Sequence, residues 1–337
     1  MQIRRVLTLA AAAVALATAP TLVAQDNDKI EQREARDVQA LLEMVNGTAA
    51  GTEPAPADFS VEWEGNHFMK AAGGGAYIPF TVVVDASQLA APEAALYVRA
   101  VSKAAAAEPP AADASYAWDD VSVVSLAADG RLSRAMVLEP GEYDLFIAMK
   151  EQGPLDLVDP LGNAIPSDAA KAAVLRRDLT VPDFEGTDLT MSSVLIGTIE
   201  PLAAPLDEEQ QRERPYTFGQ MSVTPATDLR IKTSAELQAL FWIYGAGERN
   251  SKPDVQIEYS FHRQTADGEV YFNKTPPQVL NSSTLPPQFD VATDQLPGML
   301  FVPLASFPVG EYRLEIKLTD AISGNVLTHN ATFIVEA

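Results

Sequence analysis

The sequence predicts an all-β fold, with antiparallel sheets packed face to face in tandem sandwiches after a short N-terminal helix. Three observations predict it. From residue 76 to the C-terminus, short stretches rich in Val, Leu, Ile and Tyr follow one another, and several alternate apolar with polar residues. Turn formers such as Ala-Ala-Asp-Gly at 127–130 separate these stretches, with little helical periodicity between them. One phrase, Gly-Glu-Tyr-x-Leu-x-Ile, occurs twice, at 141–147 and at 310–316.

Residues 1–24 predict a secretory signal peptide. Arg4 and Arg5 precede an apolar run at 6–19, and small residues follow up to Ala24, after which we expect cleavage. The run is shorter than the roughly 18–20 residues that span a bilayer, and the chain has no Cys that could carry a lipid anchor. We therefore expect an exported protein, periplasmic or extracellular, with no membrane insertion after the signal is removed.

Residues 26–58 predict a helix and a linker. Apolar residues recur at helical spacing between Ile30 and Val45, and we expect Gly47 to end the helix. The apolar stripe can pack on the first domain or bind a partner. A Gly-, Ala- and Pro-containing segment at 47–58 then reads as the linker.

The repeated phrase marks the ends of two domains. In Ig-like and fibronectin-like sandwiches, a Gly permits a turn before a Tyr whose ring packs and whose hydroxyl bonds nearby backbone. Tyr143 and Tyr312 fit this role, and each is followed by one more strand-like stretch. The sequence therefore predicts two Ig-like or fibronectin-like sandwiches, at 59–183 and 187–337.

The last hairpins of the two domains differ in length. The second turns within a few residues, whereas the first carries the segment 151–170 between its strands. A connection of this length is unusual in a compact domain and is often functional. Two uses remain open for it: a binding role, or a loop packed against its own domain or the neighbouring one.

Charge and cysteine content exclude several classes of function. The formal net charge is −22, and no cluster of Lys or Arg offsets it locally. Such a field repels nucleic acid, so we expect no nucleic-acid partner. The absence of Cys excludes thiol nucleophiles, iron–sulfur clusters and thiolate zinc sites.

No catalytic, cofactor-binding or metal-binding residue is assigned from the motifs, so we expect a protein that is not an enzyme and has no cofactor. His67, His262 and His329 lack the spacing of a metal site. No GxSxG elbow is present, and we expect Ser192 and Ser193 to form the polar edge of a strand.

One stretch is similar to a metal site. Val-Val-Val-Asp-Ala-Ser-Gln-Leu at 82–89 resembles the opening of a von Willebrand factor A-type metal site, but Leu89 stands where that motif needs a second Ser. The alternating helices of such a domain are also missing. The stretch therefore predicts a strand followed by a turn.

Two stretches cluster aromatic residues beside glycines. They lie at 63–70, around Trp63, and at 241–247, around Trp242. Such clusters can form the binding face for a sugar, but in sandwiches they also fill the core. Both interpretations remain open on the sequence alone.

The strand sequences resemble a family of uncharacterised exported proteins of acidobacterial-type genomes. The matching phrases are AYIPFTVVVD, LYVRAVSK, RAMVLEPGEYDLFIAM, LTVPDFEGTDLTMSSVLIG, RPYTFGQMSVTPA, KPDVQIEYSFHR and VPLASFPVGEYRLEIKLTD. The same modules are similar to regions that accompany von Willebrand factor A-related domains. The resemblance implies two Ig-like β-sandwich modules, and it brings no catalytic residues and no activity.

We therefore expect a non-catalytic interaction or structural module of the bacterial envelope that binds a protein of the cell envelope through loops or sheet edges. The alternative is a glycan-binding module that uses the Trp63 or Trp242 cluster. An enzyme has the least support, since it would need a carboxylate pair brought together from distant strands.

Overall fold

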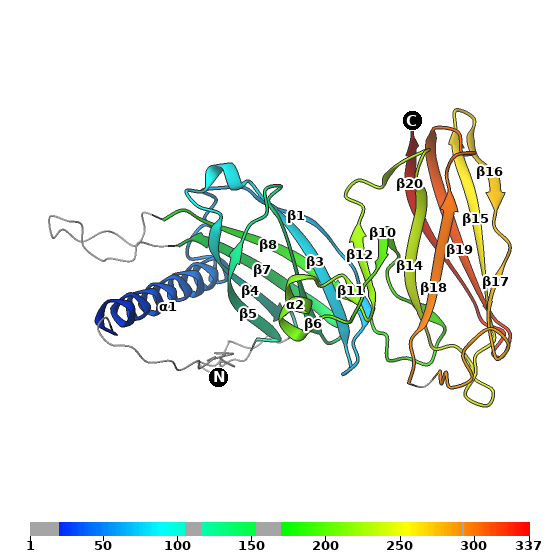
Figure 1. The fold of residues 1–337 in the computed structure, drawn as a ribbon, viewed down its shortest axis with the longest axis horizontal. Coiled ribbons are helices and arrows are strands. Elements are labelled where there is room, and N and C mark those ends of the chain that lie inside the picture. The colour runs from blue at the N-terminus through cyan, green and yellow to red at the C-terminus, as the bar shows by residue number, and fades with distance from the viewer. Residues whose placement is uncertain (1–19, 105–115, 153–169, 292) are drawn as a thin grey trace. The chain divides into compact units, whose positions relative to one another are not determined.

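The computed structural model describes residues 20–104, 116–152, 170–291 and 293–337, with side chains from residue 30 onward. Within this part of the chain the predicted all-β class is confirmed, since strands dominate and nearly all strand pairs are antiparallel (Figure 1). β13 and β20 form a parallel pair. The expected signal peptide falls largely on residues 1–19, and most of the segment 151–170 falls on residues 153–169. Both lie outside the described residues.

The described elements follow one another along the chain as two α-helices, one 3₁₀ turn and a series of strands. They are α1 (Pro20–Ala50), β1 (Val61–Asn66), β2 (Met69–Lys70), β3 (Ala76–Val84), η1 (Ala86–Gln88), β4 (Glu93–Ser102), β5 (Trp118–Ser125), β6 (Arg131–Leu138), β7 (Gly141–Glu151), β8 (Ala172–Val181), β9 (Thr190–Met191), β10 (Leu195–Pro201), α2 (Glu208–Glu213), β11 (Thr217–Phe218), β12 (Met221–Pro225), β13 (Arg230–Lys232), β14 (Glu236–Tyr244), β15 (Val255–Thr265), β16 (Gly268–Lys274), β17 (Gln278–Leu280), β18 (Leu296–Pro303), β19 (Gly310–Asp320) and β20 (Val326–Glu336).

The chain divides into two compact units. The first unit contains residues 1–63, 82–132 and 141–180, and the second contains 64–81, 133–140 and 181–337. The sheet of β1, β3, β2 and β6 therefore contributes residues to both units. The domain boundaries expected from the sequence, 59–183 and 187–337, stay a prediction.

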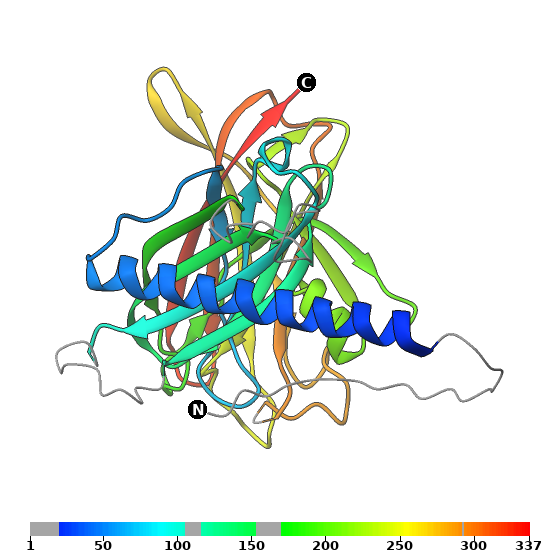
Figure 2. The same cartoon turned by 90° about the vertical axis from the view of Figure 1, so that its left-hand side faces the viewer.

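The first unit is built on a sheet with the strand order β5-β4-β7-β8, and α1 lies across this sheet (Figure 2). Leu41 and Val45 of α1 are fully buried in one cluster with Tyr97 of β4 and Phe146 of β7. The apolar stripe of the helix therefore packs on the sheet, as one of the two sequence interpretations expected. None of the helices in the described part of the chain is long and apolar enough to cross a membrane.

α1 ends later than the sequence analysis expected. Gly51, with φ of 68°, follows the last helical residue and donates its N–H to the carbonyl of Thr48. The N–H of Thr52 reaches back to the carbonyl of Gly47. These two bonds form a Schellman motif, which needs a left-handed residue at the position of Gly51. The prediction that Gly47 ends the helix was wrong, because the last turn continues past it to the glycine that the motif requires.

The repeated phrase forms the first half of β7 and of β19. Gly141 and Gly310 have nearly the same φ, 152° and 150°, and Tyr143 and Tyr312 are both buried. The Tyr312 hydroxyl donates a 2.7 Å hydrogen bond to the carbonyl of Pro308, four residues upstream. This is the tyrosine corner that the phrase predicts.

The second unit contains a sandwich of two sheets. One has the order β11-β12-β10-β14-β18, and the other has the order β13-β20-β19-β15-β16 (Figure 1). Their facing sides form one large apolar core, which includes Phe241, Tyr259, Phe261 and Leu314. Along β19 every second residue is buried, as the alternation in its sequence predicts.

The outward faces of β7 and β19 differ although the phrase is shared. Three and five residues after the Tyr, β7 carries Phe146 and Ala148, and α1 covers both. At the same two places β19 carries Glu315 and Lys317, which are partly exposed and form ion pairs. The outward face is therefore apolar on β7, where a helix covers it, and charged on β19.

Candidate functional site

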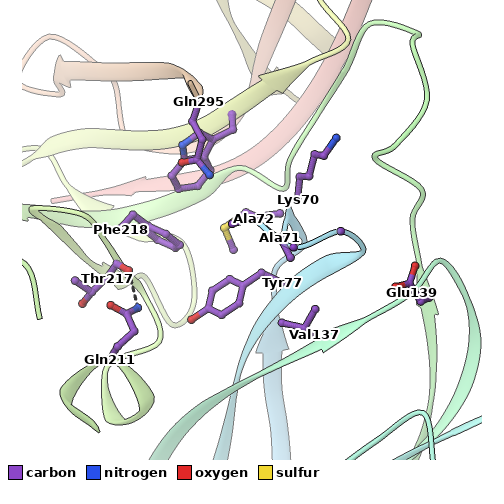
Figure 3. A pocket seen from close by; sticks show the side chains of 14 residues that line it. Lys70, Ala71, Ala72, Tyr77, Val137, Glu139, Gln211, Thr217, Phe218 and Gln295 are labelled. Carbon is purple, nitrogen blue, oxygen red and sulfur yellow. Dashed lines mark hydrogen bonds between the residues drawn. The ribbon is translucent and has the colours of Figure 1, made fainter. Parts of the chain in front are cut away.

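The second unit contains a cleft of about 520 Å³ (Figure 3). Its lining comes from the β2–β3 hairpin, the end of β6, the segment from α2 to β11, β14 and the start of β18. The lining residues are Met69, Lys70, Ala71, Ala72, Gly73, Gly74, Tyr77, Val137, Glu139, Gln211, Thr217, Phe218, Trp242 and Gln295. Hairpin, helix and strands thus bring together segments that are far apart in the sequence.

Aromatic rings form the apolar part of this cleft. Phe218 lies between two other rings, with centroids 4.6 Å from Trp242 and 6.5 Å from Tyr77, and both pairs meet edge to face. These residues belong to one cluster with Met69 and Leu240. Edge-to-face ring pairs stabilise the fold beyond what their buried area contributes, so we expect this aromatic side of the cleft to keep its shape.

Hydrogen bonds fix the polar atoms next to the rings. The Tyr77 hydroxyl donates a 2.7 Å bond to the carbonyl of Pro215, and Gln211 donates a 2.7 Å bond to the carbonyl of Thr217. Burial raises the pKa of Tyr77, and a hydrogen bond with Gln211 opposes part of that shift. Tyr77 is therefore neutral at physiological pH and acts as a positioned hydroxyl with an apolar ring.

A tight glycine turn closes one side of the cleft. Gly75 has φ of 71°, and a Cβ there would lie 2.6 Å from the carbonyl oxygen of Leu138, so only glycine fits. Lys70, before the turn, forms a 2.9 Å ion pair with Glu185, and Figure 3 shows its side chain directed away from Tyr77. Glu139 is the single carboxylate among the lining residues. This lining can bind a ligand, but it does not supply two facing carboxylates for acid–base chemistry.

The two aromatic stretches singled out in the sequence meet in this unit. The backbone N–H of Lys70 donates a 3.0 Å bond to the hydroxyl of Tyr244, and Met69 packs in the same cluster as Trp242. Trp242 is only 3% exposed, so it fills a core and lines the cleft without forming a surface platform. Trp63, in the first unit, is half-buried beneath the guanidinium of Arg177, 4.2 Å from its ring.

The three histidines lie apart from one another. His67 packs edge-on against Tyr216, with its Nδ1 3.4 Å from the tyrosine hydroxyl, and burial lowers its pKa to about 4. His262 is half-buried on the outer face of its sheet, opposite Arg313, whereas His329 is half-buried on the inner face, opposite Ile316. No group of three or more potential metal-ligating side chains occurs among the described residues.

Two sequence motifs take structural roles. Asp85 follows β3 and accepts hydrogen bonds from the backbone N–H and the hydroxyl of Ser87, which forms the turn predicted at 82–89. Ser192 was expected at a polar strand edge, but it is buried. Its hydroxyl accepts from the backbone N–H of Trp242 and donates to the carbonyl of Ser193, because a buried hydroxyl needs such partners.

The free sheet edges carry exposed apolar side chains, which the sequence analysis did not single out. Val121 and Val123 lie on β5, Val270 and Tyr271 on β16, and Phe301 on β18, and all five are exposed. Each of these strands pairs with a single neighbour in the described part of the chain. The signal was present as Val and Tyr at alternate or adjacent positions, but only the strand order shows which strands are at an edge.

No protein-family model matches the chain, and no curated protein sequence matches it. Among solved structures, the chain is similar to part of trypsin-activated alpha-2-macroglobulin from Escherichia coli, with a TM-score of 0.23 and 11% identity. It is also similar to part of Salmonella alpha-2-macroglobulin reacted with methylamine, with a TM-score of 0.20 and 13% identity. The matches cover 85% and 84% of this chain but 17% of each neighbour, so the chain spans about a sixth of their length. TM-scores this low do not establish a shared fold.

Proposed function

We propose that the protein is an exported, non-catalytic interaction module of the bacterial envelope that binds a protein partner through its sheet edges. Its leader-like N-terminus and acidic charge support the exported location, periplasmic or extracellular. The mature protein acts without a cofactor and without inserting into the membrane.

The exposed apolar edges are the observation that carries this proposal. Natural sheets protect their edges with charges, Pro or bulges, because unpaired backbone N–H and C=O groups attract other strands. β5, β16 and β18 carry such residues, but they also carry exposed Val, Tyr and Phe. An edge that combines free backbone groups with apolar side chains matches the way in which an extended segment of another protein adds to a sheet.

Cross-linking of the tagged mature protein in its native envelope, followed by mass spectrometry, tests the proposal. Each edge is guarded in turn, which means that lysine replaces its exposed apolar residues to disfavour pairing with another strand. The three variants are Val121→Lys/Val123→Lys, Val270→Lys/Tyr271→Lys and Phe301→Lys. We expect one dominant protein partner with the natural chain and its loss when the responsible edge is guarded.

Val309→Lys is the matched control, because Val309 is exposed to a similar extent but precedes β19 and belongs to no strand. This variant should capture the same partner as the natural chain. Capture of no protein, or a partner retained by all three guarded edges, would overturn the proposal.

The cleft supports a second candidate function, binding of a glycan. Sugar rings stack on aromatic faces and hydrogen-bond to amides and carboxylates, and the cleft offers Phe218 and Tyr77 with Gln211, Gln295 and Glu139 nearby. Glycan-array binding that is lost in Phe218→Ala and kept in Val309→Lys would support this function. Absence of binding to every glycan on the array would rule out this second function.

A further inference from the structure

A groove runs between α1 and the edge strand β5 in the first unit. It encloses about 250 Å³ and is lined by Glu34, Asp37, Val38, Ala95, Val121, Ser122, Val123 and Gln152. The buried cluster beneath α1 draws its strand residues from β4, β7 and β8, and none from β5. The helix therefore covers the middle of the sheet and leaves the helix-side face of its edge strand open.

Val121 and Val123 form the apolar floor of this groove. In the register of the sheet, Val121 pairs with Tyr97 and Val123 pairs with Ala95, and both partners are buried beneath α1. The two valines lie on the same face but are 38% and 47% exposed. A side chain placed beside them would extend the apolar layer that the helix already covers.

The backbone of β5 is also free on its outer side. The four-stranded sheet ends at β5, which pairs only with β4 within the described residues. An added strand would satisfy these edge groups and place every second side chain on the helix side, next to the valines. A helix laid in the groove would leave the backbone groups of the edge without partners.

The charge at the groove selects the kind of segment. Its lining includes the carboxylates of Glu34 and Asp37 and no Lys or Arg. Asp37 is paired with Lys150, whereas Glu34 is exposed. Asp119, exposed on the same face of β5, adds a second negative charge and accepts a hydrogen bond from Tyr97 at 3.2 Å. A second copy of this chain, with a net charge of −22, would bring like charges together at this edge.

We propose that the groove between α1 and β5 is a strand-addition site for a segment of a partner protein whose helix-side residues, every second one, are apolar in the middle and Lys or Arg at the ends. The proposal rests on the proposed function and assigns it to one edge. On this one face of the added strand, the partner's apolar side chains lie on Val121 and Val123, and its basic side chains lie beside Glu34 and Asp119.

The test uses the full mature protein and a fluorescein-labelled peptide of seven residues, Lys-Thr-Val-Thr-Val-Thr-Lys, whose Lys and Val side chains share one face of an extended strand. Binding is measured by fluorescence anisotropy, and hydrogen exchange of the β5 amides is followed in parallel. We expect saturable binding and slower exchange in β5. Val121→Lys/Val123→Lys should raise Kd at least about tenfold, whereas Val270→Lys/Tyr271→Lys, with the same change of charge, should leave it within about twofold.

Two further measurements separate strand addition from charge attraction. A peptide N-methylated at alternate residues keeps its charge but cannot form the backbone ladder, and it should bind at least about tenfold more weakly. Glu34→Gln, on the helix, leaves the sheet unaltered and should weaken binding while reducing its dependence on salt. Absence of binding, equal weakening by both lysine pairs, or undiminished binding of the N-methylated peptide would overturn the proposal.

The envelope cross-linking separates this inference from the proposed function. A partner that is retained by Val121→Lys/Val123→Lys but lost when β16 or β18 is guarded overturns the strand-addition site at β5 and leaves the proposed function standing. A partner that is lost only when β5 is guarded supports both.

Discussion

Lys150 of β7 and Asp37 of α1 form a buried ion pair, with Nζ and Oδ1 2.6 Å apart and side chains that are 2% and 6% exposed. The pair joins the helix to the sheet that it covers. Removing one partner of such a pair leaves a buried charge without compensation. We expect Asp37→Ala to lower the free energy of unfolding of the first unit by about 3–5 kcal/mol, measured by urea denaturation of the mature protein.

The exposed pair Lys103–Asp178, with Nζ and Oδ1 2.7 Å apart, provides the control. Asp178→Ala should leave the unfolding midpoint unchanged, because water screens an exposed pair. Replacing both buried partners, as in Asp37→Leu/Lys150→Met, should recover most of the stability lost in Asp37→Ala. A single substitution at Asp37 that costs no more than the one at Asp178 would show that the buried pair does not hold the helix.

The Tyr312 hydroxyl is expected to contribute on its own to the second unit. Tyr312→Phe keeps the ring, which stacks on Phe333 at 5.4 Å, and removes only the 2.7 Å bond to the Pro308 carbonyl. We expect a loss of about 1 kcal/mol in the free energy of unfolding. Tyr271→Phe, at a tyrosine that is 58% exposed, should change nothing. Equal effects of the two substitutions would contradict the tyrosine corner.

Much of the fold could be predicted from the sequence because it rests on local patterns. The alternation in β19 predicts its buried face, and the Gly-Glu-Tyr phrase predicts the corner at Tyr312. The end of α1 could not be read in the same way. Gly47 and Gly51 are both plausible stops, and only the bonds from Gly51 and Thr52 to earlier carbonyls decide between them.

The candidate sites depend on distant pairings that periodicity does not contain. The sequence shows aromatic residues near Met69 and near Trp242, but not that both line one cleft with Phe218. Similarly, Val121 and Val123 alternate like any half-buried pair. Their exposure follows from the position of β5 at a sheet edge that α1 does not reach.

Gly141 and Gly310 are expected to be sensitive to the addition of a single methyl group. Their φ values of 152° and 150° fall in a region that residues with a Cβ rarely adopt. At Gly141 a Cβ would meet no atom closer than 3.6 Å, so its cost there is backbone strain and not a clash. We expect Gly141→Ala and Gly310→Ala each to lower the free energy of unfolding by about 1–3 kcal/mol.

Gly65→Ala is the control for this pair, because Gly65 has no positive φ and a Cβ there would meet nothing within 4 Å. Urea denaturation should show little change for it. If all three alanine variants have the same midpoint, the shared backbone geometry of the two phrases does not constrain their sequence.

His67 is expected to make the second unit sensitive to mild acid. Burial lowers its pKa to about 4, below the ordinary 6.5, so between these values the folded state binds fewer protons than the unfolded state. The stability that the neutral imidazole contributes is therefore complete above pH 6.5 and is lost as the pH falls towards 4. At about 1.4 kcal/mol per pKa unit, the loss amounts to about 3 kcal/mol.

The free energy of unfolding, measured from pH 7 to pH 4 for the natural chain and for His67→Gln, tests this expectation. The Gln side chain does not titrate, so the decline should be shallower in the variant by the amount that His67 contributes. NMR titration of the imidazole gives an independent reading and should place its midpoint near 4. A midpoint near 6.5 with parallel stability curves would mean that the imidazole beside Tyr216 reaches water, and the packing of His67 on that ring would have to be abandoned.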